Sequence, residues 1–149
     1  MNDIKIMNHA ADNIRILTAA MVEKAKSGHP GGAMGGADFI NVLYSEYLQY
    51  DPENPEWEGR ARLFLDPGHM SPMLYGVLSM TGHFTLEDLQ QFRQWGSNTP
   101  GHPELNVMRG IENSSGPLGQ GHTYGIGAAI AAKFLAARTG NPTFNKETI

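Results

Sequence analysis

Residues 114–121 read Ser-Ser-Gly-Pro-Leu-Gly-Gln-Gly, and an apolar helical pattern follows them from Gly125 to Arg138. Nearly every residue of that pattern is Ala, Ile, Gly, Phe or Leu, which predicts a helix buried on most sides. The free N–H groups at a helix N-terminus attract anions, and glycine lets a ligand approach the backbone closely. The loop lacks the Lys of a Walker loop and the spacing of a dinucleotide-binding loop, so it indicates an anion site without identifying the ligand.

Further helices are predicted on the N-terminal side of this loop. Apolar residues at three- and four-residue spacing predict an amphipathic helix from Asp12 to Lys26, ended by Ser27 and Gly28. Thr85 offers an N-cap oxygen, with Asp88 three residues later, so a helix start is predicted there. The predicted helices after the first span residues 37–49, 71–80 and 85–95.

The evidence for β-structure is a single apolar run. The run consists of Leu63, Phe64 and Leu65 and ends before Asp66-Pro67, which predicts a brief buried strand. Residues 96–121 are rich in Gly, Pro, Asn and Ser and are predicted to be mostly irregular. Because one strand cannot form a sheet, we expect its neighbours to come from sequence beyond Ile149 or from another chain.

Glycine-containing loops carry four of the six histidines: His29, His69, His102 and His122. A single loop histidine is usually solvated or structural, but several in Gly-His contexts favour phosphate binding or proton transfer. A zinc site is the alternative, because neutral imidazole is a common zinc ligand. It is disfavoured because no His-x-x-x-His pattern occurs, the histidines are widely spaced and the chain has no cysteine.

Composition narrows the classes of partner. The net charge is −4 and the 11 Lys and Arg residues are scattered, which disfavours nucleic acid and anionic membrane surfaces. The absence of cysteine excludes disulfides and thiolate metal sites. No apolar run has the length of a membrane span, and the polar N-terminal segment lacks the apolar centre of a signal peptide, so a cytoplasmic location is predicted.

Four motifs follow one another in the order found in transketolases. They are Ser-Gly-His-Pro-Gly at 27–31, Gly-His-x-x-x-x-Leu-Tyr at 68–75, Gly-His-Pro-Glu at 101–104 and Gly-Pro-Leu-Gly-Gln-Gly at 116–121. Together they span nearly the whole chain, which therefore resembles the N-terminal part of a transketolase thiamine diphosphate-binding domain over residues 1–149. The resemblance implies an α/β fold, with a parallel sheet flanked by helices and a helix-rich portion in this chain.

The resemblance also implies an activity and a set of site residues. Transketolases transfer a two-carbon ketol unit between sugar phosphates of the pentose phosphate pathway, using thiamine diphosphate and Mg²⁺. His29 and His102 would be catalytic residues that face the sugars and bind hydroxyls or move protons. The implied cofactor-binding residues are His69 beside the diphosphate, and Gly116, Pro117 and Leu118 along the cofactor.

The family's remaining cofactor groups are not found in this sequence. Its Gly-Asp-Gly metal motif, the asparagine that follows and the glutamate that activates the aminopyrimidine would lie beyond Ile149. We therefore expect a segment truncated before the metal-binding motif, with no metal ligand of its own and inactive alone. Its expected partners are a second copy in a homodimer or a complementary C-terminal chain. The alternative is a non-catalytic interaction module that keeps the fold.

The sequence departs from the family pattern, as we interpret it, in two segments. Asp66-Pro67 stands where a more serine-like stretch is expected, and His122 and Tyr124 stand where smaller or aliphatic residues are commoner. No role is transferred to His122.

Overall fold

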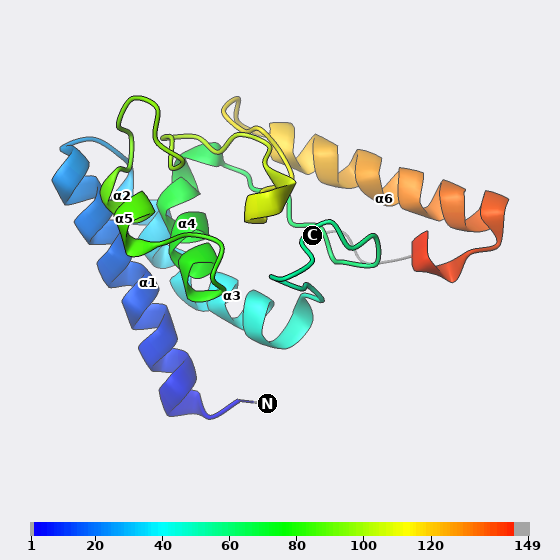
Figure 1. The fold of residues 1–149 in the computed structure, drawn as a ribbon, viewed down its shortest axis with the longest axis horizontal. Coiled ribbons are helices and arrows are strands. Elements are labelled where there is room, and N and C mark those ends of the chain that lie inside the picture. The colour runs from blue at the N-terminus through cyan, green and yellow to red at the C-terminus, as the bar shows by residue number, and fades with distance from the viewer. Residues whose placement is uncertain (1, 145–149) are drawn as a thin grey trace.

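The N-terminal part of the chain is a group of packed helices. The computed structural model describes residues 2–144 (Figure 1). The α-helices are α1 (Ile4–Ala25), α2 (Pro30–Gly35), α3 (Ala37–Val42), α4 (Ser71–Met80), α5 (Leu86–Gln90) and α6 (Gln120–Thr139). A π-helix, η1 (Leu43–Tyr47), continues α3, and short 3-10 turns form η2 (Gly68–Met70), η3 (Val107–Arg109) and η4 (Pro142–Phe144). Helix α1 packs against α2, α3 and α4.

Helix α4 lies at the centre of the hydrophobic core. Eight of its ten residues are buried. Tyr75, on this helix, is fully buried and contacts the rings of Phe84 and Phe92. Ile14 of α1 packs on the same helix at Gly76, where an added Cβ would lie 3.4 Å from the isoleucine Cγ2. Because α4 also follows the segment that carries His69, the core fixes the position of that histidine.

Local sequence signals predicted some helix bounds and missed others. The helix over 71–80 is confirmed at both ends, and the predicted N-cap at Thr85 is confirmed as a reciprocal capping box with Asp88. Helix α1 begins eight residues before Asp12, because the Asp3 carboxylate caps it by accepting the N–H of Lys5 at 2.7 Å. Helix α5 ends at Gln90, well before the predicted residue 95, and α2 was not predicted.

The predicted strand at residues 63–65 is wrong, and residues 2–144 contain no parallel sheet. Leu65 instead bonds to side chains: its N–H donates to Asn113 Oδ1 at 3.0 Å, and its carbonyl accepts from Ser115 Oγ at 3.1 Å. An isolated antiparallel bridge joins Asn106 to Ile111. The observed architecture is therefore helix-rich, because the described residues include no second strand to pair with this run.

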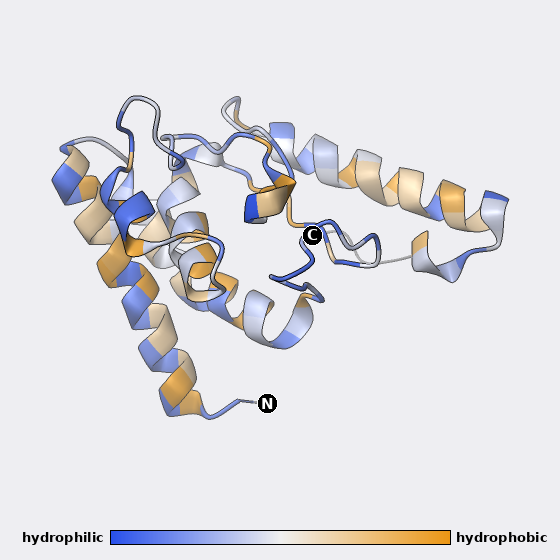
Figure 2. Cartoon of the chain, in the orientation of Figure 1, coloured by the Kyte–Doolittle hydropathy of each residue, from blue (hydrophilic) through white to orange (hydrophobic). Residues whose placement is uncertain are grey.

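Helix α6 extends away from the other α-helices (Figure 1). The prediction that it is buried on most sides is wrong for this chain, since Gly121 is its one buried residue. Ile126, Ile130 and Phe134 are 62%, 64% and 61% exposed. Figure 2 shows these apolar stretches without a covering element. An apolar sequence requires a cover to become buried, and residues 2–144 supply none. Within these residues, no helix combines the length and apolar character needed to cross a membrane.

The N-terminal turn of α6 is held by a close backbone approach at Gly121. A Cβ placed there would lie 2.5 Å from Asp66 Cβ and 2.6 Å from the Leu65 carbonyl oxygen, whereas one placed on Gly125 meets no atom within 4 Å. We therefore expect Gly121→Ala to lower the free energy of unfolding by about 1–3 kcal/mol. Gly125→Ala is the matched control and should raise the free energy of unfolding by up to about 1 kcal/mol, because alanine favours the helical conformation. Urea denaturation checks both, and equal effects would contradict the close packing at Gly121.

Candidate functional site

Two of the histidines singled out from the sequence lie side by side. His29 is the residue before α2, where Pro30 occupies the first helical position, and His69 lies in η2 just before α4. Their ring centroids are 4.8 Å apart and the ring planes are inclined by 42°. At the end of α2, Gly36 packs closely on α4, since a Cβ there would lie 2.6 Å from the sulfur of Met73. The packing of α2 on α4 thus brings together residues that are far apart in sequence.

Helix α4 also anchors the loop that carries His102. Ser71 Oγ donates to the carbonyl of Gly101 at 2.7 Å, and the Tyr75 hydroxyl donates to the carbonyl of Pro100 at 2.8 Å. Ser71 is two residues after His69, so its bond to Gly101 places the His102 loop beside the segment that carries His69. The three predicted histidines therefore converge at the N-terminal end of α4.

The surroundings of His102 favour its neutral form. Partial desolvation of the ring lowers the pKa of His102, and the positive charges of Arg93, His69 and His29 lower it further. A neutral imidazole at neutral pH has one nitrogen that accepts a proton and one that donates a hydrogen bond. His102 is therefore prepared to act as a base.

This pKa shift predicts a pH dependence. Because the folded-state pKa of His102 is depressed, the unfolded chain binds more protons just below the ordinary histidine pKa of about 6.5. The contribution of His102 to stability is then present above that pH and is lost as the pH falls through the folded-state pKa. We expect the NMR titration midpoint of the His102 ring to lie lower in the folded chain than in urea. A midpoint that is equal or higher would contradict the shift.

The loop with Gly116, Pro117 and Leu118 lies against the segment that leads to His69. A Cβ on Gly68 would lie 2.6 Å from Ser115 Oγ, so these two segments are in direct contact. The N–H of Ser115 also donates to the carbonyl of Pro103 at 3.0 Å, which joins this loop to the His102 loop. All six predicted site residues are thus carried by segments that contact one another.

The loop itself is open to a ligand. A Cβ on Gly116 would meet no atom within 4 Å, and Leu118 is 74% exposed. An exposed leucine beside a bare glycine backbone offers an apolar contact and backbone hydrogen-bonding groups in one place. This arrangement leaves the loop accessible to a ligand with both polar and apolar groups.

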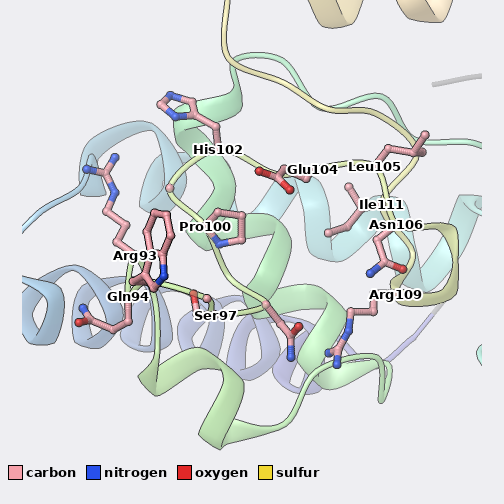
Figure 3. A pocket seen from close by; sticks show the side chains of 14 residues that line it. Arg93, Gln94, Ser97, Pro100, His102, Glu104, Leu105, Asn106, Arg109 and Ile111 are labelled. Carbon is pink, nitrogen blue, oxygen red and sulfur yellow. The ribbon is translucent and has the colours of Figure 1, made fainter.

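A cleft of about 880 Å³ lies among residues 93–111, with His102 at one edge (Figure 3). Arg93 and Arg109 lie on opposite sides of it. Arg93 donates to Ser27 Oγ at 2.7 Å, and Arg109 lies over the Phe84 ring and pairs with Asp88 at 3.4 Å. Sequence reasoning did not identify Arg93 or this cleft. Its one signal was the long irregular loop, which is typical of functional segments.

Asp88, which pairs with Arg109 beside the cleft, is bonded to groups of the chain itself. Asp88 accepts from Thr85 and Asn98, and desolvation is outweighed by these hydrogen bonds and by Arg109, so the pKa of Asp88 is lowered. Among residues 2–144 no group of three or more His, Asp or Glu side chains could hold a metal ion.

Comparison with known proteins matches nearly the whole chain to one protein family. The family described as "Transketolase, thiamine diphosphate binding domain" matches residues 6–148. Transketolase-1, chloroplastic, of Arabidopsis thaliana is 49% identical over 142 residues, which are 94% of this chain and 19% of that protein.

Solved structures of the same family superpose on this chain. A transketolase from Leishmania mexicana superposes with a TM-score of 0.87 at 44% identity, over 93% of this chain and 21% of that one. A Pichia stipitis transketolase in complex with sedoheptulose-7-phosphate gives a TM-score of 0.85 at 40% identity, over 89% and 20%. The chain spans about a fifth of the length of the relatives it matches. Both the family match and the motifs in order therefore show that this chain belongs to the transketolase family, within its thiamine diphosphate-binding domain.

Proposed function

We propose that this chain supplies the cofactor-facing N-terminal part of a transketolase, which transfers a two-carbon ketol unit between sugar phosphates. The observation that carries the proposal is the convergence of His29, His69 and His102 beside the open Gly116–Leu118 loop. Ketol transfer requires protons to be removed from and returned to sugar hydroxyls. A group of histidines next to an open cofactor loop is suited to that task.

Each histidine has a separate proposed role. The lowered pKa of His102 favours its neutral form, which can accept a proton from a sugar hydroxyl or hydrogen-bond to it. His29 is exposed just before α2 and is proposed to bind a sugar hydroxyl. His69 is half-buried and donates a hydrogen bond to the diphosphate.

The loop residues hold the cofactor in this proposal. Thiamine diphosphate supplies the nucleophilic carbon when it is bound. The open backbone at Gly116 would face the aminopyrimidine ring, Pro117 would line the cofactor, and the exposed Leu118 would pack near the thiazolium ring. The Mg²⁺ ligands are proposed to lie outside the described residues, since no suitable cluster of side chains occurs within 2–144.

Sugar phosphates are the proposed substrates. The Pichia stipitis relatives were solved with sedoheptulose-7-phosphate and with fructose-6-phosphate, which supports this class of ligand. The exposed apolar residues of α6 are proposed to be covered by a second subunit or by further transketolase sequence. A cytoplasmic location stays a prediction.

The proposal is tested with a chimera in which this chain replaces the matching 142 residues of the Arabidopsis thaliana transketolase-1. We expect ketol transfer from a ketose phosphate to an aldose phosphate that depends on added thiamine diphosphate and Mg²⁺. The unmodified host protein is the positive control. A folded chimera that neither binds the cofactor nor transfers the ketol unit would contradict the proposal.

The exposed face of α6 favours a second candidate, a non-catalytic interaction module. If the chain is such a module, it should form a stable complex with a partner protein without thiamine diphosphate. The chimera should then be inactive. Native mass spectrometry of the chain, with and without the cofactor, distinguishes the two functions.

A further inference from the structure

Two positions at which this sequence departs from the family pattern, Asp66 and His122, contact each other. His122 Nδ1 lies 2.7 Å from Asp66 Oδ2, although the two residues are 56 positions apart. The Asp66 side chain is only 8% exposed, whereas that of His122 is 76% exposed. A carboxylate removed from water requires hydrogen-bond donors, and the imidazole is one of them.

The second donor is the backbone N–H of Gly119, which lies 3.1 Å from both oxygens of Asp66. Gly119 has a φ of +86°, a conformation that glycine adopts readily and other residues rarely do. Gly121 then lets the Asp66 Cβ approach the start of α6, because any Cβ at Gly121 would overlap it. Asp66 is thus bonded at two points to the first turn of α6.

These bonds fix both ends of the proposed cofactor loop. At one end Ser115 Oγ donates to the carbonyl of Leu65, and at the other end the Gly119 N–H donates to Asp66. Gly116, Pro117 and Leu118 lie between these two anchors. The same segment continues through Pro67 and Gly68 to His69.

We propose that Asp66, assisted by His122, is a positioning residue that sets the Gly116–Leu118 loop in register with His69. The importance of this register for catalysis rests on the proposed function, whereas the anchor itself does not. The Asp66 carboxylate has two oxygens, so it can accept the Gly119 N–H and bond to the His122 ring at the same time. The histidine at 122 therefore complements the carboxylate at 66.

Amide hydrogen exchange of the full 149-residue chain, measured by NMR, tests the anchor without any cofactor. Asp66→Ala removes both hydrogen bonds, so exchange at Gly119 should become about 10-fold faster or more, as expected for bonds to a charged group. Exchange at Gly116 and Leu118 should also rise, while amides of α4 stay unchanged. Asp66→Asn keeps an oxygen that accepts the Gly119 N–H and should restore most of the protection.

Two control variants, Asp3→Ala and His9→Ala, and one further test variant, His122→Ala, separate the anchor from general destabilisation. Asp3→Ala removes a capping carboxylate from α1 and should affect exchange at Lys5 and not at Gly119. His122→Ala keeps the fold, because the side chain is exposed, and should increase exchange at Gly119 by less than Asp66→Ala does. His9→Ala, at an exposed histidine of α1, should change nothing at Gly119. Unchanged Gly119 exchange in Asp66→Ala would overturn the proposal.

Cofactor binding in the chimera provides the second measurement. Calorimetry should show weaker thiamine diphosphate binding for Asp66→Ala, with recovery in Asp66→Asn and no change in Asp3→Ala. If exchange responds but the affinity does not, the anchor exists and its positioning role is overturned. If the unsubstituted chimera binds no cofactor, the proposed function fails, and the exchange result still decides whether Asp66 anchors the loop.

Discussion

His102→Ala in the chimera is expected to lower kcat/KM for ketol transfer by about 100- to 10,000-fold, the usual contribution of one general acid or base. The reason is that alanine has no proton-accepting nitrogen, while the bonds from Ser71 and Tyr75 to the His102 loop do not involve the His102 side chain and should remain. His102 is exposed, and its removal should change the free energy of unfolding by no more than about 0.5 kcal/mol. The activity loss would then reflect chemistry, and steady-state kinetics with thermal denaturation check both parts.

His9→Ala is the matched control for this experiment, since His9 is an exposed histidine on α1 with no part in the site. Its activity should equal that of the unsubstituted chimera. The loss in His102→Ala should be greatest above the folded-state pKa of His102, where the neutral ring is present. A variant that keeps full activity at neutral pH would remove His102 from the proposed mechanism.

The sequence predicted those features that depend on local rules. The bounds of α4 follow from Pro72 near its start and a continuous apolar run, and the start of α5 follows from the Thr85 capping box. Asp3 is a comparable cap, yet the start of α1 was missed because the apolar stripe was read only from Asp12 onward. The short helix α2 was missed because its glycines hide the helical pattern.

Features that depend on distant residues could not be predicted by periodicity. The run at 63–65 has the composition of a strand, but its backbone bonds to Asn113 and Ser115 side chains. The apolar pattern of α6 indicates that the helix requires a covering surface, and the rest of the described chain does not supply one. Both errors have one physical cause, because the burial of a helix and the pairing of a strand depend on which other segments lie beside them.

The sequence motifs named the candidate site residues, but they did not predict how the segments that carry these residues contact one another. The motifs identified His29, His69 and His102, and the structure shows that α4 brings them together. The contacts of Asp66 and Arg93 match no motif, because each one forms only when segments distant in sequence come together. Arg93 bonds to Ser27, two residues before His29, and so joins the loop of the cleft to the start of α2.

Tyr75→Ala is expected to lower the free energy of unfolding by about 3–5 kcal/mol, as for other large buried aromatic side chains. Tyr75 is completely buried and contacts the rings of Phe84 and Phe92, so the collapse of the cavity is restricted on two sides. Urea denaturation followed by circular dichroism measures the change. The effect should be large enough to leave the chain partly unfolded.

Tyr75→Phe separates packing from the hydroxyl. Burial raises the pKa of Tyr75 far above its ordinary value, so the hydroxyl remains a donor to the Pro100 carbonyl at any accessible pH. Tyr75→Phe keeps the ring contacts and should cost only about 1–3 kcal/mol, because the carbonyl loses its partner. It should also loosen the His102 loop, which would raise amide exchange at Gly101 and His102. If Phe and Ala at this position were equally destabilising, the hydroxyl bond would outweigh the ring packing, and the core assigned to α4 would be wrong.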